Sequence, residues 1–418
     1  MSEAPTLTDT DAAASTSLRE FEARARAFLE EHVPRRDTVV VTDTMSAEVV
    51  ANEQELQKKI YDAGFAAITQ PKEHGGQGLG EAESMAWGAL TAGYAVPRML
   101  IAISHGMCGP IINLLGTPEQ KAKYLPDLWR ANTLFAQIFS EPGAGSDVAA
   151  LRTKAVRAER DGKAGWSLTG QKVWTSNAQY CDYGVIVART NPDVPKHQGI
   201  TMFIINLRDP AVTIRPLRVA TGEYPFNEIF IDSLFIPDSD RIGEVDKGWD
   251  AAVAMLRFER ISIGTSSTKS TGPLSFEKLA DVAREAGLAQ DPAARAALVE
   301  AHVLEQGTDL LALRMREEVE AGIDLGPRGS IAKLAGASAN FRVNEIISDI
   351  AGLSLVAWDG PGAAYPPLTK AFTGAPSSWT AGGTIEIQLG IVGERVLGLE
   401  KDPSVDRGVP FRDIRRSA

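Results

Sequence analysis

EIFIDSLFIP, residues 228–237, has the clearest strand pattern in this 418-residue chain. Ile229 and Ile231 alternate with Phe230, which is the two-residue period of a strand with one buried face. Similar short runs, separated by turn residues, precede it: WSLTG (166–170), YGVIVAR (183–189), TMFIIN (201–206) and VTIRP (212–216). Because no helical pattern intervenes, these runs predict an antiparallel sheet or a small barrel.

Helical patterns lie on both sides of this β-rich stretch. Before it, apolar residues recur every three or four positions from Leu18, and further helices are predicted near 47–64, 83–95 and 118–130. Thr117, Pro118 and Gln120 form a capping-box pattern at the start of the third of these. After the β-rich stretch, the sequence predicts a bundle of helices near 248–265, 275–286, 291–321, 328–352 and 383–397, interrupted by the Gly/Pro-rich stretch 359–376.

This order predicts an α+β protein of three domains. Residues 1–17 are acidic and rich in Ser and Thr, so we expect a loose, disordered tail. The expected domains are an all-helical one at 18–135, an antiparallel β domain at 136–246 and a helical bundle at 247–418.

The composition excludes several classes of function. Asp and Glu outnumber Lys and Arg by 54 to 43, and a chain with a net charge of −11 and no basic tract repels phosphate backbones and anionic lipids. We therefore expect neither a nucleic-acid nor a membrane partner. Two cysteines and five isolated histidines predict no metal site and no disulfide framework. The expected location is the reducing cytoplasm.

Two local stretches could carry chemistry. FSEPGAGSDVAAL (139–151) places Gly143, Gly145 and Ser146 at the entrance to the β region, where small residues let backbone approach a ligand. GQKVWTSNA (170–178) sets one Trp beside hydroxyl and amide side chains that could meet the polar edge of a planar ring. Each stretch taken alone is equally an inter-domain turn or an ordinary strand.

Together, in this order, the two stretches resemble the acyl-CoA dehydrogenase family. SEPGAGSD (140–147) is similar to the family's first signature and AGGTIEIQLGIVGERVLGL (381–399) to its C-terminal signature. The resemblance implies a helical domain, a β domain and a C-terminal four-helix bundle. It also implies FAD as cofactor, α,β-dehydrogenation of an acyl-CoA substrate, and an electron-transfer flavoprotein as electron acceptor.

This chemistry needs a base that removes the α-proton of the thioester. In many family members the base is a Glu directly before the Gly-Thr of the C-terminal signature, but Gly382 occupies that position here. Other branches place the Glu on a bundle helix before an Arg, and this chain has Glu259 followed by Arg260. At about 100° per residue, Glu259 borders the apolar stripe that contains Ala252 and Leu256. A salt bridge with a nearby Arg is the competing interpretation, but the resemblance favours Glu259 as base.

The resemblance also implies roles for other residues. The backbone N–H of Gly382 would donate to the thioester oxygen. Ser146 and Arg260 match substrate contacts. The positions implied at the cofactor are Gln137, Ile138, Phe139, Ser140, Trp174, Thr175, Ser176, Gly352, Thr384 and Glu386. Glu141 and Asp147 are expected to be structural, bonding turn amides.

The sequence departs from the family pattern at two cofactor contacts. An Arg-x-x-Phe-Gly segment, whose Arg reaches the FAD pyrophosphate of a neighbouring subunit, is replaced by SSTKSTGPLSFEKL (266–279), where Lys269 is the cation before Phe276. A glycine pair of a later FAD loop appears as Gly352-Leu353. Either the chain holds FAD differently in a homodimer or homotetramer, or a homologous chain completes the site in an α2β2 assembly, which we slightly favour.

Two other functions stay open from the sequence. One is a different flavin reaction on the same fold, of monooxygenase or desulfinase type, which needs no α-proton base. The other is a non-catalytic partner subunit of a heteromeric dehydrogenase. Glu259 counts against the first, and Ser140, Trp174 and Ser176 count against the second. The expected setting is fatty-acid or other lipid degradation. Because Gly382 has no side chain, branched or bulky acyl groups are compatible with the sequence, and shorter straight chains stay open as the alternative.

Overall fold

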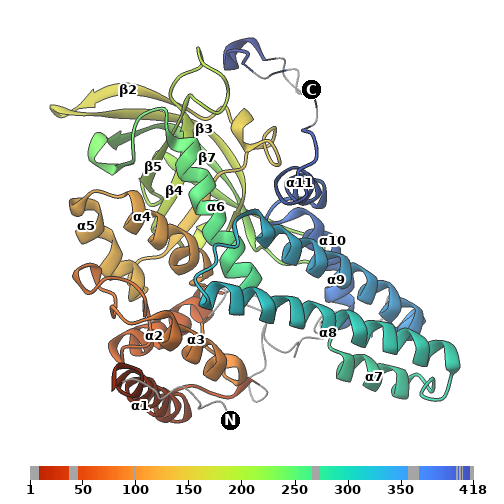
Figure 1. Ribbon diagram of the computed structural model, residues 1–418. Coiled ribbons are helices and arrows are strands. Elements are labelled where there is room, and N and C mark those ends of the chain that lie inside the picture. The colour runs from red at the N-terminus through yellow and green to blue at the C-terminus, as the bar shows by residue number, and fades with distance from the viewer. Residues whose placement is uncertain are drawn as a thin grey trace.

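The computed structural model describes residues 9–36, 46–97, 100–265, 274–355, 367–401, 403, 406 and 408–414, apart from the side chains of 9–16, 260–265, 320 and 354. Helices, a β-sheet and a second group of helices follow one another along the chain (Figure 1). Within the described residues, no helix is both long and apolar enough to cross a membrane.

The first domain is built from helices α1 to α5. Their bounds are α1 Asp9–His32, α2 Ala47–Asp62, α3 Glu81–Leu90, α4 Gly109–Leu115 and α5 Pro118–Trp129, with a π-helical turn at Ser104–Cys108 before α4. The predicted capping box is confirmed, since Gln120 N–H donates to Thr117 Oγ1 at 3.2 Å and Gln120 Oε1 accepts from Thr117 N–H at 2.9 Å.

The predicted loose tail is wrong for residues 9–17, which are the first turns of α1. The sequence explains this difference, because Asp9 and Asp11 suit the positive end of the helix dipole and Ala12–Ala14 have high helix propensity. Farther along, Phe21 and Ala25 of α1 are buried against Ile60 and Phe65. Residues 1–8 of the predicted tail lie outside the described part.

The middle domain is one eight-stranded sheet in the order β6-β7-β3-β2-β4-β5-β8, with β1 paired to β4, all within the described residues 100–265. The strands are β1 Phe135–Ile138, β2 Lys154–Arg160, β3 Lys163–Ser176, β4 Tyr183–Arg189, β5 Ile200–Asn206, β6 Val212–Leu217, β7 Phe226–Pro237 and β8 Arg241–Ile242. The antiparallel sheet predicted from the short runs is confirmed by the pairs β3–β7, β4–β5 and β6–β7. Strands β2 and β8, which no predicted run covered, pair antiparallel with β3 and β5. The sheet is mixed, however, because β1 and β2 run parallel to β4.

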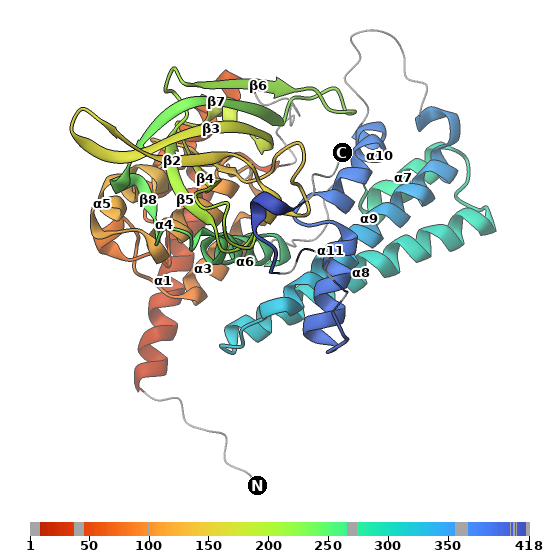
Figure 2. The same ribbon diagram turned by 90° about the horizontal axis from the view of Figure 1, so that it is seen from above.

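The last domain is helical and lies beside the sheet (Figure 2). Its helices are α6 Gly248–Thr265, α7 Phe276–Glu285, α8 Pro292–Glu320, α9 Gly329–Ala351, α10 Pro367–Thr380 and α11 Ile385–Ile391. The expected break at 359–376 is wrong for its described end, because α10 begins at Pro367 and contains Pro376. A proline fits the first helical position, and α10 is anchored to α9 where Trp379 Nε1–H donates to Ala337 O at 3.2 Å.

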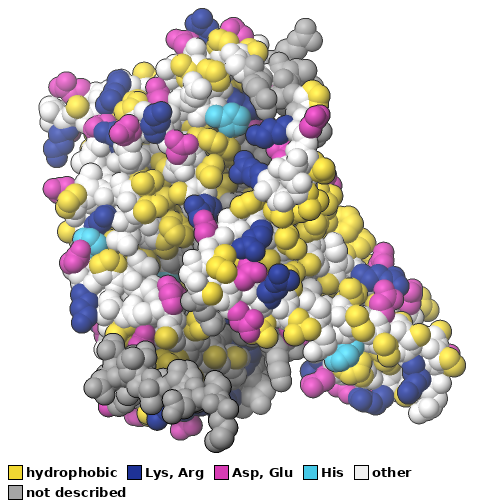
Figure 3. Space-filling view, viewed as in Figure 1, with side chains coloured by type: hydrophobic (Ala, Val, Ile, Leu, Met, Phe, Trp, Pro, Cys, Tyr) yellow, Lys and Arg dark blue, Asp and Glu magenta, His cyan; other side chains and the backbone are white. Residues whose placement is uncertain are grey.

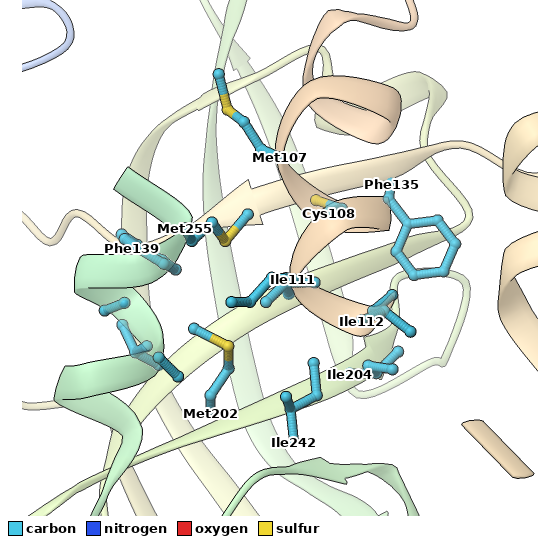
Figure 4. Close-up of a cluster of buried hydrophobic side chains, with 14 of the residues drawn as sticks. Met107, Cys108, Ile111, Ile112, Phe135, Phe139, Met202, Ile204, Ile242 and Met255 are labelled. Atoms are coloured by element: carbon cyan, nitrogen blue, oxygen red, sulfur yellow. The ribbon is translucent and has the colours of Figure 1, made fainter. Parts of the chain in front are cut away.

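One apolar core joins the three domains. Met107, Cys108 and Ile111 from the π-turn and α4 pack with strand residues and with Met255 of α6 (Figure 4). The residues of the β domain in this core are Phe135 of β1, Phe139 directly after it, Met202 and Ile204 of β5, and Ile242 of β8. This core therefore fixes α6 against β5 and the π-turn.

Candidate active site

Glu259 lies on α6, one helical turn after the fully buried Met255, and its side chain is half-buried. Gln137 of β1 donates from Nε2 to Glu259 Oε2 at 3.5 Å. The core described above explains this meeting, because α6 packs against β5 and against the π-turn 104–108, which in turn contacts β1. The sequence singled out both residues, but it gave no reason to bring them together.

Lys333 of α9 is a third member of this group that the sequence analysis missed. Its Nζ donates to Ser378 O of α10 at 2.5 Å. Burial lowers the pKa of Lys333, and the negative charge of Glu259 opposes that shift. Lys333 therefore puts a positive charge within electrostatic range of Glu259. In the sequence, Lys333 could have been found as the single charged residue in the otherwise apolar run IAKLAGA (331–337).

The Gly382 loop follows α10 directly. Gly382 and Gly383 have φ values of 67° and 89°, a left-handed conformation that glycine adopts without strain. Buried Gln388 holds the loop by donating from Nε2 to Gly382 O at 2.9 Å and Gly383 O at 3.5 Å. No hydrogen bond among the described residues uses Gly382 N–H, so this donor is free to meet a ligand.

Two segments of the β domain, the first of which begins at Gln137, lie together. Val173 N–H donates to Ser140 O at 3.0 Å, which brings residues 137–140 beside residues 174–176. Trp174 interrupts the pairing of β3 with β7, has a φ of 61° and is 58% exposed. Ser140 and Ser176 are half-buried nearby. We call residues 137–140 and 174–176 the flavin wall.

The flavin wall fits a planar aromatic cofactor. Trp174 offers an exposed ring, and a Cβ placed on Gly143 or Gly145 would meet nothing within 4 Å, so the adjoining loop has an open face. The side chains of Ile138, Phe139 and Thr175 are buried, at 0%, 5% and 2% exposure. These three residues could therefore contact a cofactor only through their backbone atoms. The residue types in the sequence do not indicate such a backbone contact.

Three other residues predicted for the site, Ser146, Thr384 and Glu386, lie outside the flavin wall, on the loop after β1 and at the start of α11. Ser146 is exposed on the loop between β1 and β2, next to Asp147, which accepts from Lys196 Nζ at 2.7 Å. Thr384 caps α11 by accepting from Ile387 N–H at 3.3 Å. Glu386 is exposed in the first turn of α11, where its own backbone N–H and Thr384 lower the pKa of its carboxyl.

Three further predictions are tested only in part or not at all. Gly352 ends α9 with a φ of 52°, and its neighbour Leu353 is 82% exposed. The side chain of Arg260 and all of residues 266–273, including Lys269, lie outside the described part of the chain.

Family models match almost the whole chain. The model of the acyl-CoA dehydrogenase N-terminal domain matches residues 15–132, that of the middle domain residues 136–234, and that of the C-terminal domain residues 246–397. These three matches follow the three structural domains in order.

Individual relatives carry the same family name. Acyl-CoA dehydrogenase FadE34 of Mycobacterium tuberculosis is 38% identical over 356 residues, or 85% of this chain and 48% of FadE34, so the chain spans about half the length of that relative. Acyl-CoA dehydrogenase IpdE1 of Mycolicibacterium smegmatis is 31% identical over 346 residues, 81% of this chain and 86% of IpdE1. Among solved structures, the Tcur3481-Tcur3483 steroid ACAD is 25% identical, with a TM-score of 0.76 over 93% of this chain and 98% of that chain.

Proposed function

This chain belongs to the acyl-CoA dehydrogenase family of FAD-dependent oxidoreductases, and we propose that it converts an acyl-CoA thioester to the trans-2-enoyl-CoA with Glu259 as base. The observation that carries the proposal is the Gln137–Glu259 contact of 3.5 Å. It places a carboxylate beside the strand that leads into the flavin wall. A substrate held between the two would present its α-carbon to Glu259.

The surroundings of Glu259 suit proton abstraction. The side chain is half-buried, and Gln137 donates to one of its oxygens. The positive charge of Lys333 favours the ionised carboxylate, which is the form that can accept a proton. Gln137 also restricts the orientation of the carboxylate by donating to Oε2.

The Gly382 loop supplies the second requirement, a donor for the thioester oxygen. When the α-proton leaves, negative charge develops on that oxygen, and a preoriented backbone N–H stabilises it. Gly382 N–H is free among the described residues, while Gln388 holds the carbonyls of the same loop in place. FAD held at the flavin wall would supply the acceptor for the hydride that leaves the β-carbon.

The experiment that tests this function is anaerobic titration of the purified flavoprotein with a set of acyl-CoA thioesters. Bleaching of the visible flavin band by at least one thioester, with formation of the enoyl-CoA product, is expected. A flavin band that no thioester bleaches, together with oxygen consumption by the chemically reduced protein, would contradict the proposal and favour monooxygenase chemistry. The Glu259→Gln variant, which is expected to retain FAD, serves as a control for unspecific reduction.

We also propose that the acyl group is bulky, that the assembly includes a second homologous chain, and that an electron-transfer flavoprotein accepts the electrons. Gly382 leaves space where a Glu side chain would stand, and one solved relative is called a steroid ACAD and carries two component names. A comparison of linear with ring-bearing thioesters tests the first point. Co-expression with candidate partner chains tests the second, and unchanged flavin content and activity would refute it.

A further inference from the structure

A buried ion pair lies directly behind the flavin wall. Lys172 of β3 is 0% exposed and Glu141 is 7% exposed, and Lys172 Nζ lies 3.0 Å from Glu141 Oε1. Each residue adjoins one of the two segments: Glu141 follows Ser140, and Lys172 precedes Trp174 by two positions. The pair takes no part in the proton transfer proposed above.

Glu141 uses its two oxygens to hold the loop that connects β1 with β2. Oε2 accepts from Arg152 N–H at 2.6 Å, and Oε1 accepts from Thr153 N–H at 2.9 Å. The predicted role of Glu141 in bonding turn amides is thereby confirmed. The loop and β3 approach each other so closely that a Cβ on Gly170 would lie 2.4 Å from Thr153 Oγ1.

Lys172 acts on the flavin wall itself, because its Nζ also donates to Phe139 O at 2.9 Å. In a planar trans peptide the C=O and N–H groups point in opposite directions. A Phe139 carbonyl turned inward to Lys172 therefore turns the N–H of Ser140 outward. No hydrogen bond among the described residues uses that N–H, while Ser140 O is occupied by Val173 N–H.

Stability alone does not explain this pair. Removing two charges from water costs several kcal/mol per ion, and an apolar pair of similar volume often stabilises a protein as well or better. The loop and strand could be joined by apolar packing. An apolar side chain at position 172, however, could not hold the Phe139 carbonyl in its inward orientation.

We propose that Lys172, held by Glu141, is a positioning residue that aims the Ser140 N–H out of the flavin wall at the polar edge of the flavin. The backbone donor is then fixed before the cofactor binds, and it stabilises negative charge on the ring. This inference rests on the flavin wall assigned in the proposed function. It does not depend on Glu259.

The test measures FAD affinity, the visible spectrum and the reduction potential of the bound flavin in Lys172→Met and in the double variant Glu141→Gln/Lys172→Met. The dissociation constant of FAD is expected to rise at least about tenfold, the effect of one lost charge-assisted hydrogen bond, with a shift in spectrum and potential. The double variant leaves no unpaired buried charge. If Lys172→Met alone does not fold, the FAD affinity of the double variant tests the positioning role instead.

Two further variants make the result specific. Leu168→Ala removes a fully buried side chain from the same strand and should lower the unfolding midpoint, yet leave FAD affinity, spectrum and potential unchanged. Trp174→Ala tests the flavin wall directly. Weakened FAD binding in Trp174→Ala with wild-type affinity and spectrum in the Lys172 variants would overturn only the positioning role. Unchanged binding in all of them would overturn the flavin wall and this inference with it.

Discussion

The two halves of the site are built in different ways. The flavin wall is part of a hydrogen-bonded sheet and is backed by the buried pair Glu141–Lys172. The opposite half stands on helices, where Glu259 meets Gln137 at 3.5 Å and Lys333 is held by Ser378. The β half therefore obtains its geometry from backbone pairing and the helical half from a few side-chain contacts.

The surfaces around the two halves differ as well. Apolar side chains gather over the region of α9, α10 and α11 (Figure 3). Phe372 and Trp379 of α10 and Leu389 of α11 are 40%, 38% and 53% exposed, and Leu310 of α8 is 63% exposed. An exposed apolar surface of this kind is typical of an interface. The second homologous chain proposed above would cover this surface of the helical half.

Glu259→Gln should have the largest effect, because it removes the group assigned to proton abstraction and keeps the side-chain volume. We expect kcat to fall by at least about a thousandfold. The FAD content should stay unchanged, since the β half is untouched. Steady-state turnover and the flavin absorbance ratio measure the two quantities. Near-normal turnover would refute the assignment of the base.

Glu141→Gln should mainly reduce stability, because it leaves Lys172 buried without its counter-charge, at a cost of about 3–5 kcal/mol. Burial alone would raise the pKa of Glu141, but Lys172 and the amides of Arg152 and Thr153 lower it overall. A lowered folded-state pKa contributes stability above the unfolded value of 4.5 that is lost as the pH falls through the folded value.

Urea unfolding followed by tryptophan fluorescence checks this pH dependence. The difference in unfolding free energy between the wild type and Glu141→Gln should be widest at neutral pH and narrow at pH values below 4.5. Leu168→Ala is the matched control, because a lost apolar contact gives a difference that does not follow the titration of a carboxylate. A pH-independent gap for Glu141→Gln would contradict the role of its charge.

Gln388→Met should have a smaller effect on the helical half. It removes the donor to Gly382 O and Gly383 O, so the loop can rotate and Gly382 N–H is less well aligned. We expect kcat to fall about tenfold, less than for the complete loss of an oxyanion donor, with little change in KM. Thr380→Ala, an exposed position before the same loop, is the control. An equal loss in both variants would argue against this explanation.

Lys333→Met should have the smallest effect. Without the positive charge of Lys333, the ionised form of Glu259 is less favoured, so the acidic limb of the kcat/KM profile should move to higher pH. Activity at alkaline pH should change little. Lys333→Arg retains the charge and should leave the limb in place. An acidic limb that stays fixed or moves downward in Lys333→Met would refute the electrostatic role.

Local patterns predicted the features that depend on neighbouring residues. The capping box at Thr117 and the alternation in 228–237 are properties of short segments, and both are present in the structure. Glu259 was placed at the border of an apolar stripe, and its side chain is half-buried. By contrast, α10 was missed because Pro367 and Pro376 were interpreted as breaks, whereas contacts with α9 hold this helix.

Contacts between distant segments could not be predicted. Gln137 and Glu259 are separated by 122 positions, and their meeting depends on how the shared core packs α6 against β5 and the π-turn. The contact of Lys333 on α9 with Ser378 on α10 likewise depends on how these two helices pack. Lys172 was quoted within GQKVWTSNA, but a single sequence does not reveal that its charge is buried against Glu141.

The most direct test of Glu259 separates proton removal from hydride transfer. The protein with its flavin chemically reduced cannot oxidise a substrate, but its base can still exchange the α-proton of a bound acyl-CoA with deuterium from D2O. Mass spectrometry of the recovered thioester measures that exchange. We predict α-deuteration by the wild type and background exchange by Glu259→Gln at equal FAD content. Exchange by Glu259→Gln at the wild-type rate would contradict the account.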